Sequence, residues 1–190
     1  LAVHLDFPEV AALAQMNLGA TYLKQTAWHE AERHLLESRQ TYERTGTRVY
    51  LAELLRYQAE LYLQQGNLSD ALPLAQAAQQ LAEELDQMQL GQTYRVLGQV
   101  YCGLGQYAEA EEALQDSISL LRKQDDLYEV GLTLLAEAKL WNVQMTTGAN
   151  EDTGYQQAVT TLEEAIQIFA DLGAQADLEQ AKRSLIQTRR

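Results

Sequence analysis

The sequence of 190 residues has little proline, little cysteine and few aromatic side chains. Two prolines and 7% aromatic residues, beside abundant Ala, Leu, Gln and Glu, disfavour a sheet protein and predict an all-α chain without strands. The single cysteine, Cys102, excludes an intramolecular disulfide and cannot build a thiolate metal site by itself. A reducing, cytoplasmic localisation is therefore favoured.

Positive charge and long apolar runs are also scarce. Fourteen Lys and Arg residues against 27 Asp and Glu give a formal net charge of -13, which would repel a phosphate backbone and argues against a nucleic-acid partner. No apolar run approaches the roughly 18 residues that a membrane-spanning helix needs, so no membrane partner is expected. The first residue is Leu1 rather than Met, and we interpret the chain as a segment of a longer protein.

The motifs that carry catalytic chemistry are missing. The sequence has no phosphate-binding glycine loop and no nucleophile elbow. His29 and His34 are five residues apart, about 140° around a helix, so they cannot form the i, i+4 pair of a zinc-protease helix and are expected at the surface. Residues 145–154 lack the ligand alternation of a calcium loop and are interpreted as a surface insertion, with contact to a partner as the alternative. We expect no cofactor, no metal and no enzymatic activity.

Apolar residues recur at helical spacing in nine segments that are separated by short turns. Asp6 is expected to cap the first helix, Gly46 to close the second, and Pro73 to distort the first turns of the fourth. The predicted helices are, approximately, 6–24, 28–44, 49–65, 68–85, 88–104, 107–123, 127–144, 155–170 and 175–188.

Small residues recur in these segments at a nearly constant interval. In the first helix of each pair they are separated by 40, 39 and 40 residues, and in the second by 40, 39 and 48, where the extra eight residues are the insertion. The first row is Gly19, Ala59, Gly98 and Ala138, and the second is Ala31, Ala71, Ala110 and Ala158. A helical Gly costs about 1 kcal/mol relative to Ala. Gly19 and Gly98 therefore predict that the two helices of a pair pack closely at these points.

Two of the four units carry a further pattern. Leu97-Gly98-Tyr101 is followed by Ala110-Leu114-Ser117, and Leu18-Gly19-Tyr22 is followed by Ala31-Leu35-Ser38. These residues resemble the signature of the tetratricopeptide repeat (TPR) family over about residues 8–172. The period near 40, rather than the usual 34, resembles the longer repeats of bacterial signal-transduction ATPases, transcription activators and kinesin light chains.

The resemblance implies an α-α superhelix, or solenoid, of four helix-turn-helix repeats and a C-terminal helix, in a single domain over residues 1–190. The repeats would span about 8–46, 47–86, 87–125 and 126–173. First helices would line the concave side. The family's early Trp is replaced in every unit, and so is the proline that usually closes the second helix. Met16 and Ala20 stand where chaperone-tail binders have a clamp of Lys and Asn, so such a clamp is not supported.

The first-helix face opposite the row of small residues is predicted to line a peptide-binding groove. Arg56, Arg95 and Lys139 would form a positive ladder for an acidic or carboxylate-bearing segment. The alternative is that they are ordinary solvated residues paired with Glu53 and Glu60. The full set of predicted groove residues is Met16, Leu23, Arg56, Glu60, Leu63, Arg95, Gln99, Leu135, Lys139 and Asn142.

These patterns lead to one functional hypothesis and one alternative. The hypothesis is a protein–protein or peptide interaction module that binds a partner segment in its concave groove, as a scaffold within a larger regulatory or signalling protein. Charge reversal at Arg56 plus Arg95 is then expected to weaken binding without unfolding the array. The alternative is a structural spacer or homodimerisation element, in which open ends or the convex face join two copies.

Overall fold

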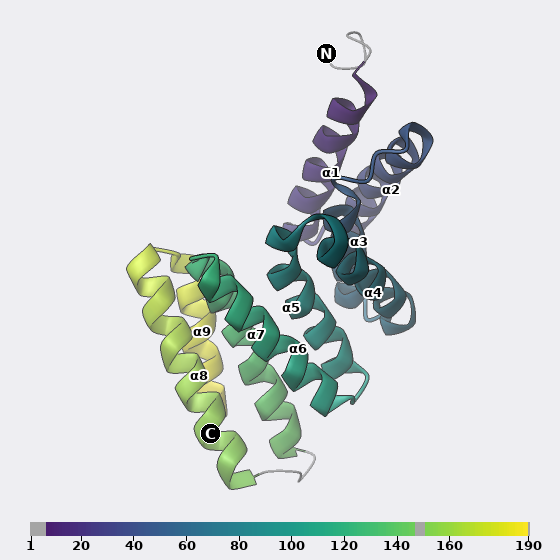
Figure 1. Ribbon diagram of the computed structural model, residues 1–190. Coiled ribbons are helices and arrows are strands. Elements are labelled where there is room, and N and C mark those ends of the chain that lie inside the picture. Colours follow the sequence, from purple (N-terminus) through teal and green to yellow (C-terminus); the bar gives the residue numbers. More distant parts are fainter. Residues whose placement is uncertain (1–6, 147–150, 190) are drawn as a thin grey trace. The chain divides into compact units, whose positions relative to one another are not determined.

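The computed structural model describes residues 7–146 and 151–189, apart from the side chains of 151–153. Within these residues the regular structure consists of α-helices joined by short turns (Figure 1). They form four consecutive helix hairpins and a terminal helix, which confirms the predicted all-α repeat fold. The helices are α1 (Pro8–Lys24), α2 (Trp28–Thr45), α3 (Leu51–Gln64), α4 (Leu68–Leu85), α5 (Gln87–Gly103), α6 (Tyr107–Lys123), α7 (Leu127–Thr146), α8 (Glu151–Leu172) and α9 (Gln175–Thr188).

Most helix boundaries lie within two residues of the predicted ones, and α8 is the main exception. It begins at Glu151 rather than near Tyr155, so part of the predicted polar insertion is helical. Residues 147–150 of that insertion and the predicted cap Asp6 lie outside the described residues. The N-cap of α1 is Phe7, which makes no side-chain capping hydrogen bond. Pro73 lies inside α4, and the helix continues unbroken from Leu68 to Leu85.

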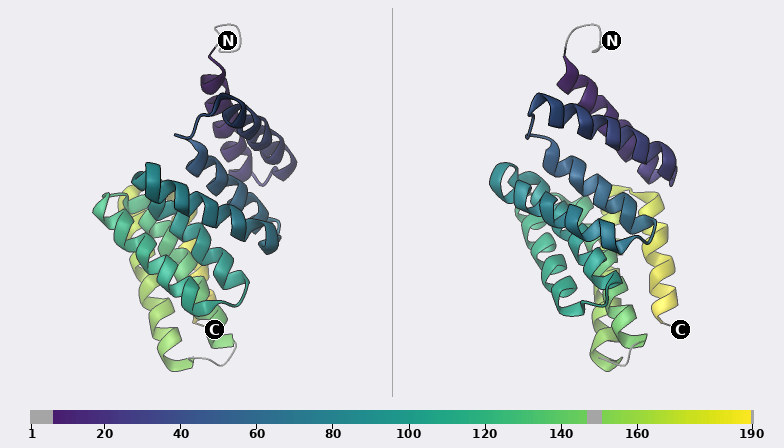
Figure 2. Two further views of the ribbon diagram at one scale, coloured as in Figure 1. Left: turned by 45° about the vertical axis from the view of Figure 1, so that its right-hand side comes forward. Right: turned by 90° about the vertical axis from the view of Figure 1, so that its right-hand side faces the viewer.

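The chain divides into two compact units, and the boundary falls within α5. Unit 1 is Leu1–Val96 and unit 2 is Leu97–Arg190. Unit 1 contains the hairpins α1–α2 and α3–α4 and the first part of α5. Unit 2 contains the rest of α5 with α6, the hairpin α7–α8, and α9, which packs on α8. Figure 2 shows the hairpin partners side by side in two further views.

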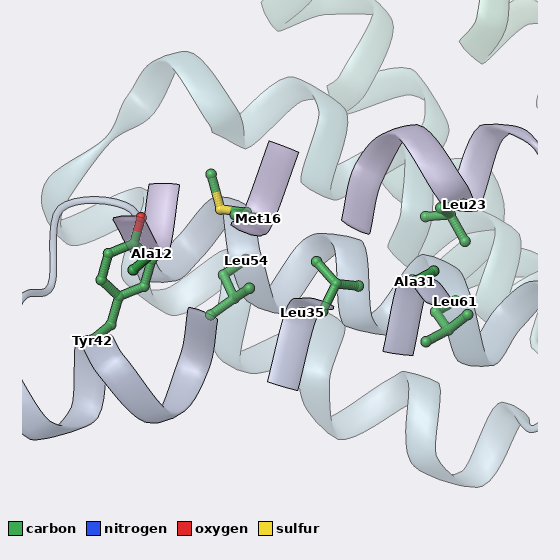
Figure 3. Close-up of a cluster of buried hydrophobic side chains, with 8 residues drawn as sticks. All are labelled: Ala12, Met16, Leu23, Ala31, Leu35, Tyr42, Leu54 and Leu61. Atoms are coloured by element: carbon green, nitrogen blue, oxygen red, sulfur yellow. The ribbon is translucent and has the colours of Figure 1, made fainter. Parts of the chain in front are cut away.

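The core of unit 1 forms where α1, α2 and α3 meet, as the close-up in Figure 3 shows. A Cβ atom added at Gly19 of α1 would lie 2.7 Å from Cγ of Leu35 on α2. The glycine therefore allows the two helices to approach, as its place in the repeat predicts. The buried cluster is Ala12, Met16, Leu23, Ala31, Leu35, Tyr42, Leu54 and Leu61.

The core of unit 2 is likewise a cluster of buried apolar side chains from consecutive helices, here α6, α7, α8 and α9. Gly131 of α7 is a point of close approach in this unit, because an added Cβ would lie 2.8 Å from the ring of Phe169 on α8. The terminal helix α9 joins this core through Leu178 and Ala181. The cluster that includes them is Ile118, Leu121, Val130, Leu134, Ala165, Phe169, Leu178 and Ala181.

Several turns between helices contain a residue in the left-handed backbone conformation. Gly46 closes α2 with φ of 73°, as predicted from its position. Within the hairpins, Gly66 and Gly105 have φ of 76° and 75°. Thr26 occupies the equivalent turn of the first hairpin with φ of 57°, a conformation that a β-branched residue rarely adopts. The first hairpin therefore closes with a strained residue where the second and third hairpins have glycine.

Candidate functional site

The apolar anchors predicted in unit 1 are largely buried. Met16 and Leu23 belong to the core cluster, together with Leu54 and Leu61 of α3. The face of α1 that was predicted to line a groove is thus partly covered by the next first helix. Leu63 is half-buried. Met16 and Leu23 do not present a surface that a ligand can contact in this conformation.

Arg56 is also buried, with 3% of its surface exposed. Its guanidinium lies 3.8 Å from carboxylate oxygens of Glu53 and Glu60, and 4.2 Å from the ring centroid of Tyr57. Its Nη2 donates a hydrogen bond to Oε1 of Gln89 at 3.4 Å. This pairing with Glu53 and Glu60 matches the alternative interpretation of the basic residues, although Arg56 is not solvated as that interpretation assumed.

Among the three basic residues of the predicted ladder, Lys139 alone is exposed. Arg95 is buried, and it interacts with other residues of the chain. Burial raises the pKa of the Cys102 thiol, and the positive charge of Lys139 on α7 has a smaller effect in the opposite direction. Lys139 and Cys102 therefore lie within electrostatic reach of each other on adjacent first helices.

The remaining groove residues of unit 2 are half-buried: Gln99, Leu135 and Asn142. Asn142 has a defined partner, because its Nδ2 donates to Oγ1 of Thr188 at 3.0 Å, and the same hydroxyl lies 3.1 Å from its Oδ1. Thr188 belongs to α9. The terminal helix thus engages the Asn142 position, and the accessible part of the predicted face in unit 2 centres on Leu135 and Lys139.

His34 does not lie at the surface as expected. It is buried against α1, with its ring stacked on Tyr22 at a centroid distance of 5.2 Å. Its Nδ1 is hydrogen-bonded to Oε1 of Gln15, and its Nε2 lies 2.9 Å from Nη2 of Arg33. The structured part of the chain contains no group of three or more His, Cys, Asp or Glu side chains suited to a metal ion. His34 is therefore a packing residue between α1 and α2.

A groove that was not predicted lies on the second-helix side of unit 2. It has a volume of about 570 Å³ and is lined by residues of α6, α7 and α8. A smaller hollow of about 310 Å³ adjoins it and shares Glu137 and Thr161. The groove is lined by Gln115, Ile118, Ser119, Arg122, Leu134, Glu137, Thr160, Thr161 and Glu164.

Glu137 is the buried charged group of this groove, with 9% of its surface exposed. Oγ1 of Thr161 donates a hydrogen bond to its Oε2 at 3.3 Å. Burial raises the pKa of the Glu137 carboxyl; the Thr161 bond lowers it, Glu111 and Glu164 raise it, and Arg122 lowers it. Arg122 itself forms an ion pair with Glu164 across the groove at 2.5 Å.

One signal in the sequence marks Glu137. The residue immediately before the small residue of each first helix is Leu18, Gln58, Leu97 or Glu137, and only the last of these is charged. In unit 1 the equivalent Gln58 lies beside the preceding second helix, where Nη1 of Arg39 donates to its Oε1 at 3.2 Å. The charge at this repeat position could therefore have identified Glu137 from the sequence as part of a polar site.

Helix hairpins that repeat every 39 or 40 residues define an α-helical repeat protein. The family model described as tetratricopeptide repeat matches residues 10–84 and 50–123, which together exceed half of the chain. The chain belongs to the tetratricopeptide repeat family. In the part of the chain that the structure describes, no helix combines the length and apolarity needed to cross a membrane.

A solved structure has the same fold. The chain is similar to BtubC (BKLC) from P. vanneervenii, with a TM-score of 0.64 and 14% sequence identity, over 99% of this chain and 82% of that chain. At this identity the likeness concerns the fold alone. A comparison with curated proteins found no match.

Proposed function

We propose that the chain is an interaction module that binds a segment of a partner protein through the exposed face of its first helices, within a larger regulatory or signalling protein of the cytoplasm. Tetratricopeptide repeats are in general protein–protein interaction domains. The observation that supports this proposal most directly is the exposed Lys139 beside the half-buried Leu135 on α7. A cation next to an apolar surface suits a segment that carries an acidic group and an apolar side chain.

Because Arg56 and Arg95 are buried, Lys139 is the basic residue of the predicted ladder that can contact a partner. Both arginines are engaged within the protein, so reversing their charges would act on the fold as well as on binding. Lys139 is exposed and permits a charge reversal that leaves the core intact. Substitution of Lys139 therefore tests partner binding without changing the stability of the fold.

The test is a pull-down from native cell extract with wild-type protein, Lys139→Glu and the control Lys123→Glu. Lys123 is also an exposed lysine in unit 2, at the end of α6 and outside the proposed face. A partner of this face should be captured by wild type and by Lys123→Glu, and lost with Lys139→Glu. Equal capture by all three proteins would contradict the proposal.

A second function, self-association, is favoured by the exposed apolar stripe of α1. Phe7, Val10 and Leu18 are 56%, 55% and 45% exposed. Leu18 occupies the same position in its repeat as Gln58 of α3. Gln58 contacts the preceding hairpin, because it accepts a hydrogen bond from Arg39 of α2. Leu18 thus occupies a position that another helix covers in the next repeat. Light scattering over a concentration series tests this, since the mass should double for wild type and stay monomeric for Val10→Glu with Leu18→Gln.

A further inference from the structure

The two units differ at an equivalent pair of positions on neighbouring helices, and the difference indicates a binding site. Gln58 of α3 and Glu137 of α7 lie 79 residues apart and occupy the same place in the repeat. In unit 1 a guanidinium of the chain itself, that of Arg39, bonds to Gln58. The residue 79 positions after Arg39 is Ile118, which lines the groove of unit 2. Unit 2 therefore has the carboxylate of Glu137 at the position of Gln58. It has the apolar side chain of Ile118 at the position of Arg39.

Within the described part of the groove, Glu137 has Arg122 nearby but forms no ion pair of its own. The charged groups that face it are Glu111 and Arg122 from α6, and Glu164 from α8. Arg122 is paired with Glu164, and among the described residues no ion pair joins Glu137 to a base. A buried carboxylate without a counter-charge is costly, and a cation that enters the groove would lower that cost.

We propose that the groove between α6 and α8 binds an arginine side chain of a partner protein, whose guanidinium pairs with Glu137. Ile118 and Leu134 form apolar walls for the methylene stem of the arginine. The planar guanidinium matches a carboxylate in two parallel hydrogen bonds, which a lysine ammonium does not provide. This site lies on the second helices and α7, and so goes beyond the first-helix face proposed above.

The shape of the groove favours a protein segment over a free guanidinium compound. Its volume of about 570 Å³ is within the range of about 300–1,000 Å³ for ligand-binding clefts. The adjoining hollow extends it toward Trp141, Gln156 and Gln157. Gln156 and Gln157 are exposed, and they offer two amides to residues that flank the arginine in an extended chain.

The first experiment follows backbone amide signals of the ¹⁵N-labelled chain by NMR during titration with N-acetylarginine amide. The neutral isostere N-acetylcitrulline amide is the matched control ligand. We expect shifts of residues around the groove, such as Ser119, Glu137 and Thr161, with arginine and not with citrulline. Equal shifts with both compounds, or shifts elsewhere in the chain only, would overturn the proposal.

Two variants test the residues. Glu137→Gln keeps the acceptor for Thr161 and removes the charge, and should reduce the affinity at least tenfold. Glu163→Gln makes the same change on α8 at an exposed residue paired with Arg189, outside the groove lining, and should leave the affinity unchanged. Ser119→Arg adds an internal guanidinium at an exposed position of the groove, and should abolish binding while the protein stays folded. Wild-type affinity in Glu137→Gln or Ser119→Arg contradicts the assignment.

A final comparison separates a protein segment from a free compound. A seven-residue Gly/Ser peptide with one central arginine should bind at least tenfold more tightly than N-acetylarginine amide, and the same peptide with citrulline should not bind. Equal affinity of the peptide and the amide would overturn the partner-protein assignment. Lys139→Glu should leave arginine binding intact, because Lys139 does not line this groove. The test of the groove is therefore independent of the test of the first-helix face.

Discussion

Gly98 of α5 and Leu114 of α6 are packed so closely that a Cβ atom on Gly98 would lie 2.6 Å from Cγ of Leu114. The same addition would lie 3.1 Å from the carbonyl oxygen of Ala110. The row of small residues that defines the repeat is therefore a row of direct helix contacts.

Replacing this glycine should destabilise the protein. Gly98→Ala gains about 1 kcal/mol in helix propensity, yet the clash with Leu114 should leave a net loss of about 1–3 kcal/mol in the free energy of unfolding. Urea denaturation followed by circular dichroism measures this. In a Leu114→Ala background the cost of Gly98→Ala should fall, because the clashing atoms are gone. A cost that is the same in both backgrounds would show that Leu114 is not the cause.

The strained turn at Thr26 predicts a stabilising substitution. A residue with a side chain costs about 1–2 kcal/mol in the left-handed region, and glycine avoids this at an unfolded-state entropy cost of about 0.4–1 kcal/mol. Thr26→Gly should therefore raise the unfolding free energy by about 0.5–1 kcal/mol. Gly66→Thr, the reverse change at the equivalent turn, should lower it. Thermal unfolding of both variants checks the opposite signs.

Charge reversal at Arg56 should unfold unit 1 or weaken it strongly. The new carboxylate would be buried beside Glu53 and Glu60, and breaking a buried ion pair costs about 3–5 kcal/mol. Arg56→Glu should therefore lower the urea midpoint markedly. Lys139→Glu makes the same charge change at an exposed residue and should alter stability by less than about 0.5 kcal/mol. Equal effects of the two variants would contradict the burial of Arg56.

The carboxyl of Glu137 should make stability depend on pH. Burial raises its folded-state pKa, so the folded protein holds this proton more tightly than the unfolded chain does. The resulting stabilisation is present below the ordinary pKa of 4.5 and is lost as the pH rises through the raised value. Glu137→Gln does not titrate, and should therefore be more stable than wild type at pH 8.

Unfolding free energies from pH 4 to pH 8 test this sign. The advantage of Glu137→Gln should shrink as the pH falls toward 4, because wild-type Glu137 becomes neutral. Glu163→Gln, at an exposed ion pair with Arg189, should differ little from wild type over the whole range. A Glu137→Gln variant that is less stable than wild type at pH 8 would show that the carboxylate is already well paired.

The sequence predicts the helices and the hairpin contacts because both depend on local spacing. Gly19 and Gly98 identify the face that meets the second helix, and the structure places Leu35 and Leu114 against them. It does not predict which other face is free. A first helix in a repeat array also contacts neighbouring first helices, so Leu23, expected in a groove, packs with Leu61 of the next pair.

Burial of polar residues was harder to predict for the same reason. The surroundings of Arg56 include Gln89 of a later helix, which no spacing within one hairpin reveals. His34 was expected at the surface because its spacing from His29 rules out a metal pair, yet Tyr22 from α1 stacks on its ring. The predicted start of α8 was too late, because residues 145–154 were treated as one turn-rich segment. The helix includes the last four of them.

The contrast between the pair Arg39–Gln58 and the pair Ile118–Glu137 also bears on how repeated units diverge. Duplicated units begin with the same internal contacts, and each copy can then change independently. Where one copy has both members of a contact and another has a polar group opposite an apolar residue, the first copy serves as an internal reference for the second. Comparing units within a single chain can thus point to the chemical nature of a binding partner without any second sequence.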